Sequence, residues 1–277
     1  MTTSLRRIWL FVIPVLAVAG LLYINPAGAQ SNDQGTIAKQ LLGPDETDRH
    51  TALAAAQRLG AKMDPTLRTA LFTALEREGK RHAERYRATK RGEALGDMED
   101  AEFIGALTRA VVPLRDARAI PALVDALGTS ALVTNALADF GEPAAPAVLA
   151  VVTSTESMPD AIDHGLITLR FMVEGSLGRL SPGLLAQIRA AASQRLTGQQ
   201  PFVSTIWRAI DLAMALKDPD LTKIVQSIAD SPFEVRSRGV TEPDLVERTQ
   251  KWASDRLAGV PALPTRLVLP RYAQRHE

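Results

Sequence analysis

The chain has 277 residues, of which 46% are hydrophobic and 23% are charged, and its formal net charge is +1. This near-neutral balance gives no global electrostatic case for binding nucleic acid or an anionic surface. The chain has no cysteine, which excludes disulfides, thiolate zinc sites, iron–sulfur clusters and cysteine nucleophiles. Aromatic residues make up only 5%, and this composition favours closely packed helices over β-sheets.

The first 29 residues have the pattern of a secretory signal peptide. Two arginines precede the uncharged apolar run 8–24, and the small residues Ala27 and Ala29 follow it. We therefore expect cleavage after Ala29 and export to the periplasm, the cell envelope or the extracellular space. The alternative is an uncleaved membrane anchor, for which the run is short. Contact with a membrane is expected only in that case.

Helical periodicity dominates the rest of the chain. Residues 30–45 are polar, contain Gly and Pro, and are expected to form a flexible linker. Apolar residues then recur at i, i+3, i+4 and i+7, as in the segment 117–127, and no segment alternates with a period of two. We therefore predict an all-α domain over residues 46–258, followed by a C-terminal tail at 259–277. The predicted helices span residues 46–59, 65–91, 98–113, 117–127, 130–140, 143–154, 159–174, 181–197, 201–217, 219–230 and 242–258.

One helical unit is repeated. Pro121 and Pro146 are 25 residues apart, and the aliphatic residues that follow them match at the same offset. Each proline lies near an expected helix start, where its missing N–H costs little. One further helix separates the two copies, so the repeating unit is a helix pair. Such a pair cannot bury its apolar face alone, and stacking of successive pairs would create a continuous core.

The stretch RDARAIPALVDALG (115–128) resembles the HEAT-like repeats of the bilin-lyase type, in which D-x-R-A-x-P-A-L precedes an aliphatic pair and Ala-Leu. The stretches 94–103 and 215–229 are similar. The resemblance implies an α-solenoid of stacked antiparallel helix pairs, of the HEAT or armadillo kind. It implies little about chemistry, because these repeats mostly serve as binding scaffolds without a fixed set of functional residues.

The sequence contains no recognisable catalytic or metal motif. The four histidines are scattered, and none has a metal-binding spacing. We therefore predict no catalytic residue, cofactor or metal. Four acidic residues could bind calcium. They directly precede an apolar helical stripe, however, and acidic residues in the first turn of a helix interact favourably with the helix dipole, so a helix start is the favoured interpretation. These are Asp97, Glu99, Asp100 and Glu102.

A basic run at residues 76–93 is the candidate site for a partner. Arg77, Arg81 and Arg85 lie at i, i+4 and i+8 of the predicted helix, where like charges repel one another. Acidic groups of a partner could relieve this repulsion. The alternative is a solvated helix face with acidic partners inside the molecule. The candidate partner-binding residues are Arg77, Lys80, Arg81, Arg85, Lys90 and Arg91.

These observations favour a non-catalytic repeat protein that mediates protein–protein interaction or assembly in the periplasm or cell envelope, through the concave face of the solenoid. One alternative is a repeat-type enzyme or enzyme accessory, similar to a chromophore lyase. Another is an anion-binding module that uses the basic run at 77–91. Nucleic acid is not an expected partner, because the chain is near neutral and carries an export signal. A perturbed titratable pair in the groove would favour the enzyme.

Overall fold

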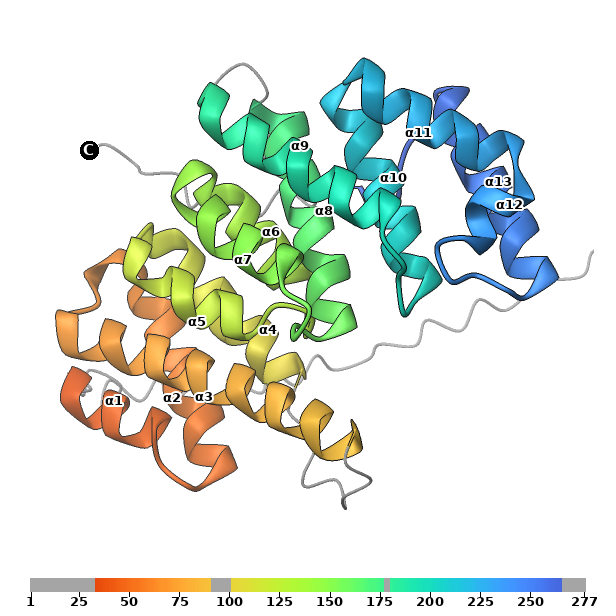
Figure 1. Cartoon of the computed structure of the whole chain (residues 1–277). Coiled ribbons are helices and arrows are strands. Elements are labelled where there is room, and N and C mark those ends of the chain that lie inside the picture. Colours follow the sequence, from red (N-terminus) through yellow and green to blue (C-terminus); the bar gives the residue numbers. More distant parts are fainter. Residues whose placement is uncertain (1–32, 91–100, 177–179, 266–277) are drawn as a thin grey trace, which may run out of the picture. The chain divides into compact units, whose positions relative to one another are not determined.

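The computed structural model describes residues 33–90, 101–176 and 180–265, and all regular secondary structure in these residues is helical (Figure 1). The all-α prediction is therefore confirmed for this part of the chain. The signal-peptide pattern and residues 266–277 of the predicted tail lie outside the described residues, as do Asp97, Glu99 and Asp100.

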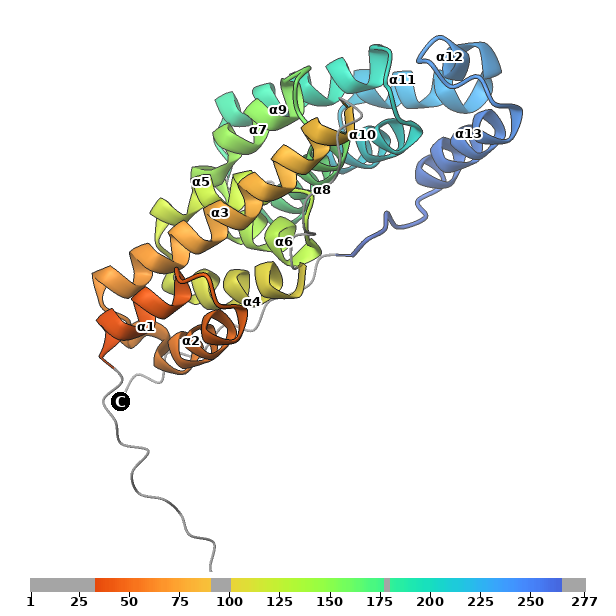
Figure 2. The same cartoon turned by 90° about the horizontal axis from the view of Figure 1, so that it is seen from below.

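The helices stack in two layers (Figure 2). The first layer contains α1 (Gln34–Leu41), α3 (Pro65–Lys90), α5 (Ile120–Asp125), α7 (Ala145–Thr153), α9 (Pro182–Thr197) and α11 (Pro219–Asp230). The second layer contains α2 (Glu46–Leu59), α4 (Ala101–Val111), α6 (Ala131–Phe140), α8 (Pro159–Ser176), α10 (Val203–Leu216) and α13 (Pro243–Leu257). Successive helices of each layer pack on one another, and each helix also packs on a neighbour in the other layer. This is the stacked-pair arrangement of an α-solenoid.

The repeated unit has the same local structure in both copies. A 3-10 turn, η4 (Ala117–Ala119) or η5 (Glu142–Ala144), leads into α5 or α7, and a proline occupies one of the first two helical positions. Leu123 and Val148, which the 25-residue offset aligns, are both fully buried. The prediction of a repeated helix pair is thus confirmed at these positions. The repeat exists because matching apolar faces must be covered by the next pair.

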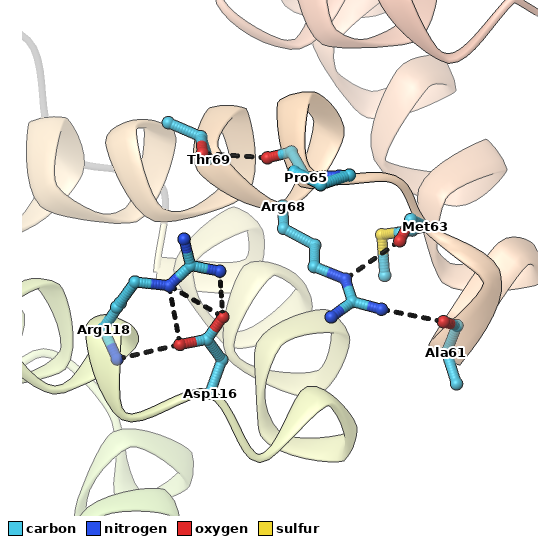
Figure 3. Close-up of polar contacts among 7 residues, drawn as sticks. All are labelled: Ala61, Met63, Pro65, Arg68, Thr69, Asp116 and Arg118. Carbon is cyan, nitrogen blue, oxygen red and sulfur yellow. Dashed lines mark hydrogen bonds and ion pairs between the residues drawn. The ribbon is translucent and has the colours of Figure 1, made fainter.

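The Asp and Arg of the repeat motif form a capping turn (Figure 3). Asp116 Oδ1 accepts a hydrogen bond from the Arg118 backbone N–H at 3.0 Å, and the Arg118 Nε donates to the same oxygen at 2.9 Å. This contact holds the pKa of Asp116 below its ordinary value. Nearby, the Arg68 guanidinium donates to the carbonyls of Met63 and Ala61. The polar residues of the motif therefore organise a turn, as their place before the helix predicts.

The linker prediction for residues 30–45 is wrong at residues 34–41, which form α1. Ile37 and Leu41 of this helix are buried against α2 and α3. The helix is short and has few apolar residues, so packing on its neighbours stabilises it more than its own propensity does. The packed helical region accordingly begins before residue 46.

Two other segments also differ from the predictions. The break expected at 230–243 contains the short helix α12 (Pro232–Arg236), which packs on α11 and α13. The helix expected at 117–127 is α-helical only between Ile120 and Asp125. Short 3-10 turns also follow α2 and α4, at η2 (Gly60–Lys62) and η3 (Val112–Leu114). Tight 3-10 turns at helix ends satisfy backbone groups that the α-helix leaves free.

The core is built from small and aliphatic side chains, which lets helices approach closely. At Gly79 of α3, a Cβ atom would lie 2.6 Å from the backbone nitrogen of Ala126. Only glycine therefore permits this contact between α3 and the end of α5.

No single helix in the described ranges is long and apolar enough to cross a membrane, whereas the bent pair of α6 and Glu142–Thr153 meets the length and composition requirements. In that pair Leu137 and Val148 are core residues.

Candidate functional site

The basic run lies on the C-terminal half of α3, and its first members contact groups of the same molecule. Arg77 Nη1 donates to the backbone carbonyl of Leu42 at 3.1 Å. Lys80 pairs with Glu76 one helical turn earlier. Arg81 Nη1 lies 3.1 Å from an oxygen of Glu78, whose side chain is only 2% exposed.

Of the remaining candidates in the run, the structure describes only the side chain of Arg85. Arg85 also interacts within the molecule, whereas the Lys90 side chain and Arg91 lie outside the described residues. The contacts favour the alternative of a helix face whose positive charges have intramolecular partners. Binding of a partner by these residues stays a prediction.

A groove lies along the second layer, where the sequence predicts no site. Its volume is about 650 Å³, within the usual range for ligand sites. It is bounded by α6, α8, α10 and α13, and by a non-helical segment that follows α13. Its exposed lining surface is mostly apolar, with polar groups contributed by α6, α8, α10 and the segment after α13. The lining residues are Ala131, Thr134, Asn135, His164, Ile167, Phe171, Arg208, Trp252, Leu263, Pro264 and Thr265.

Three arginines of the second layer donate to backbone carbonyls of the segment that follows α13. Arg256 of α13 donates to the Val260 carbonyl at 3.1 Å. Arg208 of α10 donates to the Leu263 carbonyl at 2.5 Å. Arg170 of α8 donates to the Pro264 carbonyl. We call Arg170, Arg208 and Arg256 the arginine ladder, because they come from three successive helices of the second layer.

A buried carboxylate holds part of the ladder in place. Asp211 of α10 is 3% exposed, and its Oδ1 accepts hydrogen bonds from Arg256 Nε at 2.7 Å and from Trp252 Nε1 at 3.0 Å. Its second oxygen lies 3.6 Å from Arg208 Nη1. A buried carboxylate is tolerated where cations and donors surround it. Asp211 therefore orients two ladder arginines and one aromatic wall of the groove.

The aromatic wall is Trp252, which is stacked on Trp207 of α10. The rings of Trp207 and Trp252 lie 5.1 Å apart at an interplanar angle of 12°. Trp207 Nε1 donates to Thr249 Oγ1 at 3.0 Å. The guanidinium of Arg256 lies 4.5 Å from the centre of the Trp252 ring, a distance typical of cation–π contact. These contacts hold the rings rigidly, so this wall of the groove is preformed.

Two titratable groups of α8 lie at or beside the groove. His164 lines it, and its Nδ1 is 2.7 Å from the Thr134 hydroxyl of α6. Burial lowers the pKa of His164. Asp163 accepts a hydrogen bond from Thr205 of α10 at 2.6 Å, and burial raises its pKa. The two side chains have different hydroxyl partners on different helices, so each of these bonds ties α8 to a neighbouring helix.

The other sequence-based candidates do not converge on a site. His50 packs against Phe103, with ring centres 4.9 Å apart. Within the described residues no group of three or more His, Asp or Glu side chains is placed to hold a metal ion. Glu102 lies in the first turn of α4, which agrees with the helix-start interpretation of the acidic group.

The sequence does not predict the groove, because the residues that line it are far apart in the chain. A local signal nevertheless exists: Arg170 and Asp211 each interrupt an otherwise apolar helical stripe, within LITLRFMV and WRAIDLAMAL. A charge on a face that must be buried requires a specific partner. The sequence could have marked both as unusual, but it could not have identified their partners.

No protein-family model matches the chain, and no curated protein sequence matches it. Among solved structures, the chain is similar to a computationally designed armadillo repeat protein made for modular peptide recognition. The two share 13% sequence identity with a TM-score of 0.40, over 82% of this chain and 99% of the designed protein. The stacked helix pairs themselves show a helical-repeat solenoid, and membership of the bilin-lyase-type HEAT family stays a prediction.

Proposed function

We propose that this protein is an exported, non-catalytic repeat protein that binds a peptide segment of another protein in the groove of the second layer. The arginine ladder is the observation that carries the proposal. Three guanidinium groups donate to main-chain carbonyls of the non-helical segment, and Arg208 also lines the groove, so donors for a peptide backbone lie in and beside the groove.

The chemistry of the groove suits this task. Guanidinium groups can hydrogen-bond any backbone carbonyl, whatever the side chain, so they supply affinity without strict sequence selection. The apolar walls, Ile167, Phe171 and Trp252, can bury side chains of the bound peptide. Stacked rings and buried ion pairs hold the groove in one shape, which lowers the entropy lost on binding.

Export is supported by the signal-peptide pattern of residues 1–29. The absence of cysteine is compatible with export, because a large helical core needs no disulfides. A non-catalytic role is supported by the separate bonding of Asp163 and His164, each to a different threonine. The competing enzyme function draws on the same two groups, because both have perturbed pKa values. The enzyme function would be favoured if the purified protein turned over a substrate without any partner and if the His164→Gln variant lost this activity.

A random-peptide library displayed on phage tests the proposed function. We expect the protein to enrich peptides with an apolar centre. Arg208→Ala should weaken their binding about tenfold or more, because a hydrogen bond from a charged donor is worth about 1.5–3 kcal/mol. Fluorescence anisotropy of labelled synthetic peptides gives the dissociation constants.

Arg189→Ala is the matched control. Arg189 lies on α9 of the first layer, where it pairs with Asp218, and its side chain is half exposed. This variant should bind the enriched peptides like the unchanged protein. An equal loss in both variants, or no enrichment at all, would contradict binding in the groove.

A further inference from the structure

The segment Val260–Thr265, which follows α13, lies along the groove, and Leu263, Pro264 and Thr265 form part of its wall. Figure 2 shows the chain leaving α13 and running back along the second layer toward α8. All three ladder arginines donate to its carbonyls, at residues 260, 263 and 264. The segment is therefore seated by its backbone, as we propose for a partner.

This seating leaves the groove open and two apolar side chains of the segment largely exposed. Leu263 is 60% exposed and Val260 is 47% exposed, although their backbones are hydrogen-bonded to the ladder. The cavity of about 650 Å³ remains open beside Leu263 and Pro264. A peptide that made the same backbone contacts and also placed a large apolar side chain in this cavity would bury more apolar area. It would therefore outcompete the segment for the ladder.

The segment contributes to the hydrogen bonding of a buried arginine of the ladder. Arg170 is 2% exposed, and burial lowers the pKa of its guanidinium. Its Nε has no hydrogen-bond partner among the described residues and lies 3.7 Å from Glu174. Without the Pro264 carbonyl, the buried cation would lose a further acceptor, which is costly in a poorly hydrated site. If the segment leaves, a partner peptide or water that enters the opened site has to supply that acceptor.

The residue types of the segment indicate what the ladder selects. The ladder offers only donors, since a guanidinium has no acceptor. Proline contributes a carbonyl without adding an N–H that would need an acceptor. An aliphatic residue followed by proline, as in Leu263-Pro264, thus presents two successive carbonyls and one fewer donor to the groove. This suits a site of arginines better than most dipeptides do.

We propose that Val260–Thr265 is a built-in occupant of the groove, and that the partner is a peptide with a large apolar residue followed by proline, which displaces it. The inference rests on the proposed function and adds the partner's chemistry and a regulatory role for the C-terminal segment. The segment is tethered to α13, so its local concentration is high. Its contacts are nevertheless few, which allows a partner that also fills the cavity to replace it.

A labelled peptide with the sequence of residues 260–265 and blocked ends tests this proposal. We compare its affinity for the complete protein with that for a variant lacking residues 260–277, whose fold is checked by circular dichroism. We expect at least tenfold tighter binding to the shortened variant. Arg208→Ala in that variant should weaken binding by about tenfold or more. If the shortened variant does not fold, the Leu263→Gly/Pro264→Gly variant of the complete chain replaces it, because two flexible residues loosen the segment.

Two altered peptides test the predicted selectivity. In the peptide, Leu263→Phe should tighten binding by filling the cavity, and Pro264→Ala should weaken it by adding an unpaired N–H. Equal affinity of the original peptide for the complete and the shortened protein would overturn the built-in occupant. Equal affinities of the three peptides would overturn the proposed partner chemistry. If library peptides bind in an Arg208-dependent way but the segment's own peptide does not bind, this inference fails while the proposed function stands.

Discussion

Arg256 Nε and Asp211 Oδ1 are 2.7 Å apart, and neither side chain is more than 8% exposed. This pair joins α13 to α10 across the second layer, and it connects the core to the groove. Asp211 also accepts from Trp252, a wall of the groove, while Arg256 continues to the Val260 carbonyl. The pair therefore links the stability of the last helix to the geometry of the candidate binding site.

Asp211→Ala should lower the free energy of unfolding by about 3–5 kcal/mol, because the change leaves a buried guanidinium without its counter-ion. Urea unfolding followed by circular dichroism measures this. Trp252 loses a hydrogen-bond partner at the same time, so the fluorescence of the folded protein should also change. Asp255→Ala on α13 is the control. Asp255 pairs with the exposed Lys251, and its removal should cost less than about 1 kcal/mol. Similar losses in the two variants would contradict the role given to Asp211.

Gly79→Ala should lower the free energy of unfolding by about 1–3 kcal/mol or more, because the new methyl group would meet the backbone of Asp125 and Ala126 at 2.6–2.8 Å. Thermal and urea unfolding measure the effect. Gly183→Ala, near the start of α9, has open space around its Cβ position. It should be neutral or stabilising by up to about 1 kcal/mol, because alanine favours helix more than glycine does. A destabilised Gly183 variant, or a neutral Gly79 variant, would contradict this packing.

Leu123→Ala should destabilise the fold by about 2–5 kcal/mol, because it opens a cavity in the core beneath the repeat motif. Leu123 is fully buried, whereas Leu42 is 39% exposed. The same truncation at Leu42 should therefore cost less than about 1 kcal/mol. Equilibrium unfolding of both variants is the measurement. Equal losses would mean that the motif residue does not belong to the shared core.

His164 should make the protein less stable as the pH falls below about 6.5. Burial lowers its pKa in the folded state, whereas the unfolded chain takes up the proton near pH 6.5. The unfolded state then binds more protons, so acidification favours unfolding. Charged and titratable neighbours are Asp160, Asp163, Arg208 and His82.

The pH effect is measured by urea unfolding at pH 7.5 and pH 5.5. The stability lost between these two values should shrink in the His164→Gln variant. It should persist in Asp163→Asn, because the raised pKa of Asp163 changes stability in the opposite sense, with stability falling as the pH rises. An unchanged pH dependence in His164→Gln would show that another group is responsible.

The local features of the fold could be predicted from the sequence. Pro121 and Pro146 mark the repeated helix starts, and their aliphatic neighbours form the core. Gly128 and Gly141 directly follow the predicted helices 117–127 and 130–140, and they have positive φ angles of 104° and 67°. Such signals are readable because they depend on residues three or four positions apart. The short helix α1 was missed, because contacts with distant helices stabilise it.

The sequence by itself determined an all-helical fold with a repeated helix pair. The spacing of apolar residues and the Pro and Gly residues at helix starts and ends are local properties, so they can be read from the sequence. Only the tertiary structure decided where a peptide could bind. Arg170, Arg208 and Arg256 lie 38 and 48 residues apart, yet they serve one short segment because stacking places α8, α10 and α13 in succession. The same packing gave Arg77 of the basic run a distant partner, the Leu42 carbonyl, whereas Lys80 and Arg81 pair with acids of their own helix. Side chains from separate helices become neighbours only through burial of the apolar faces between them, and no local pattern records which faces will meet.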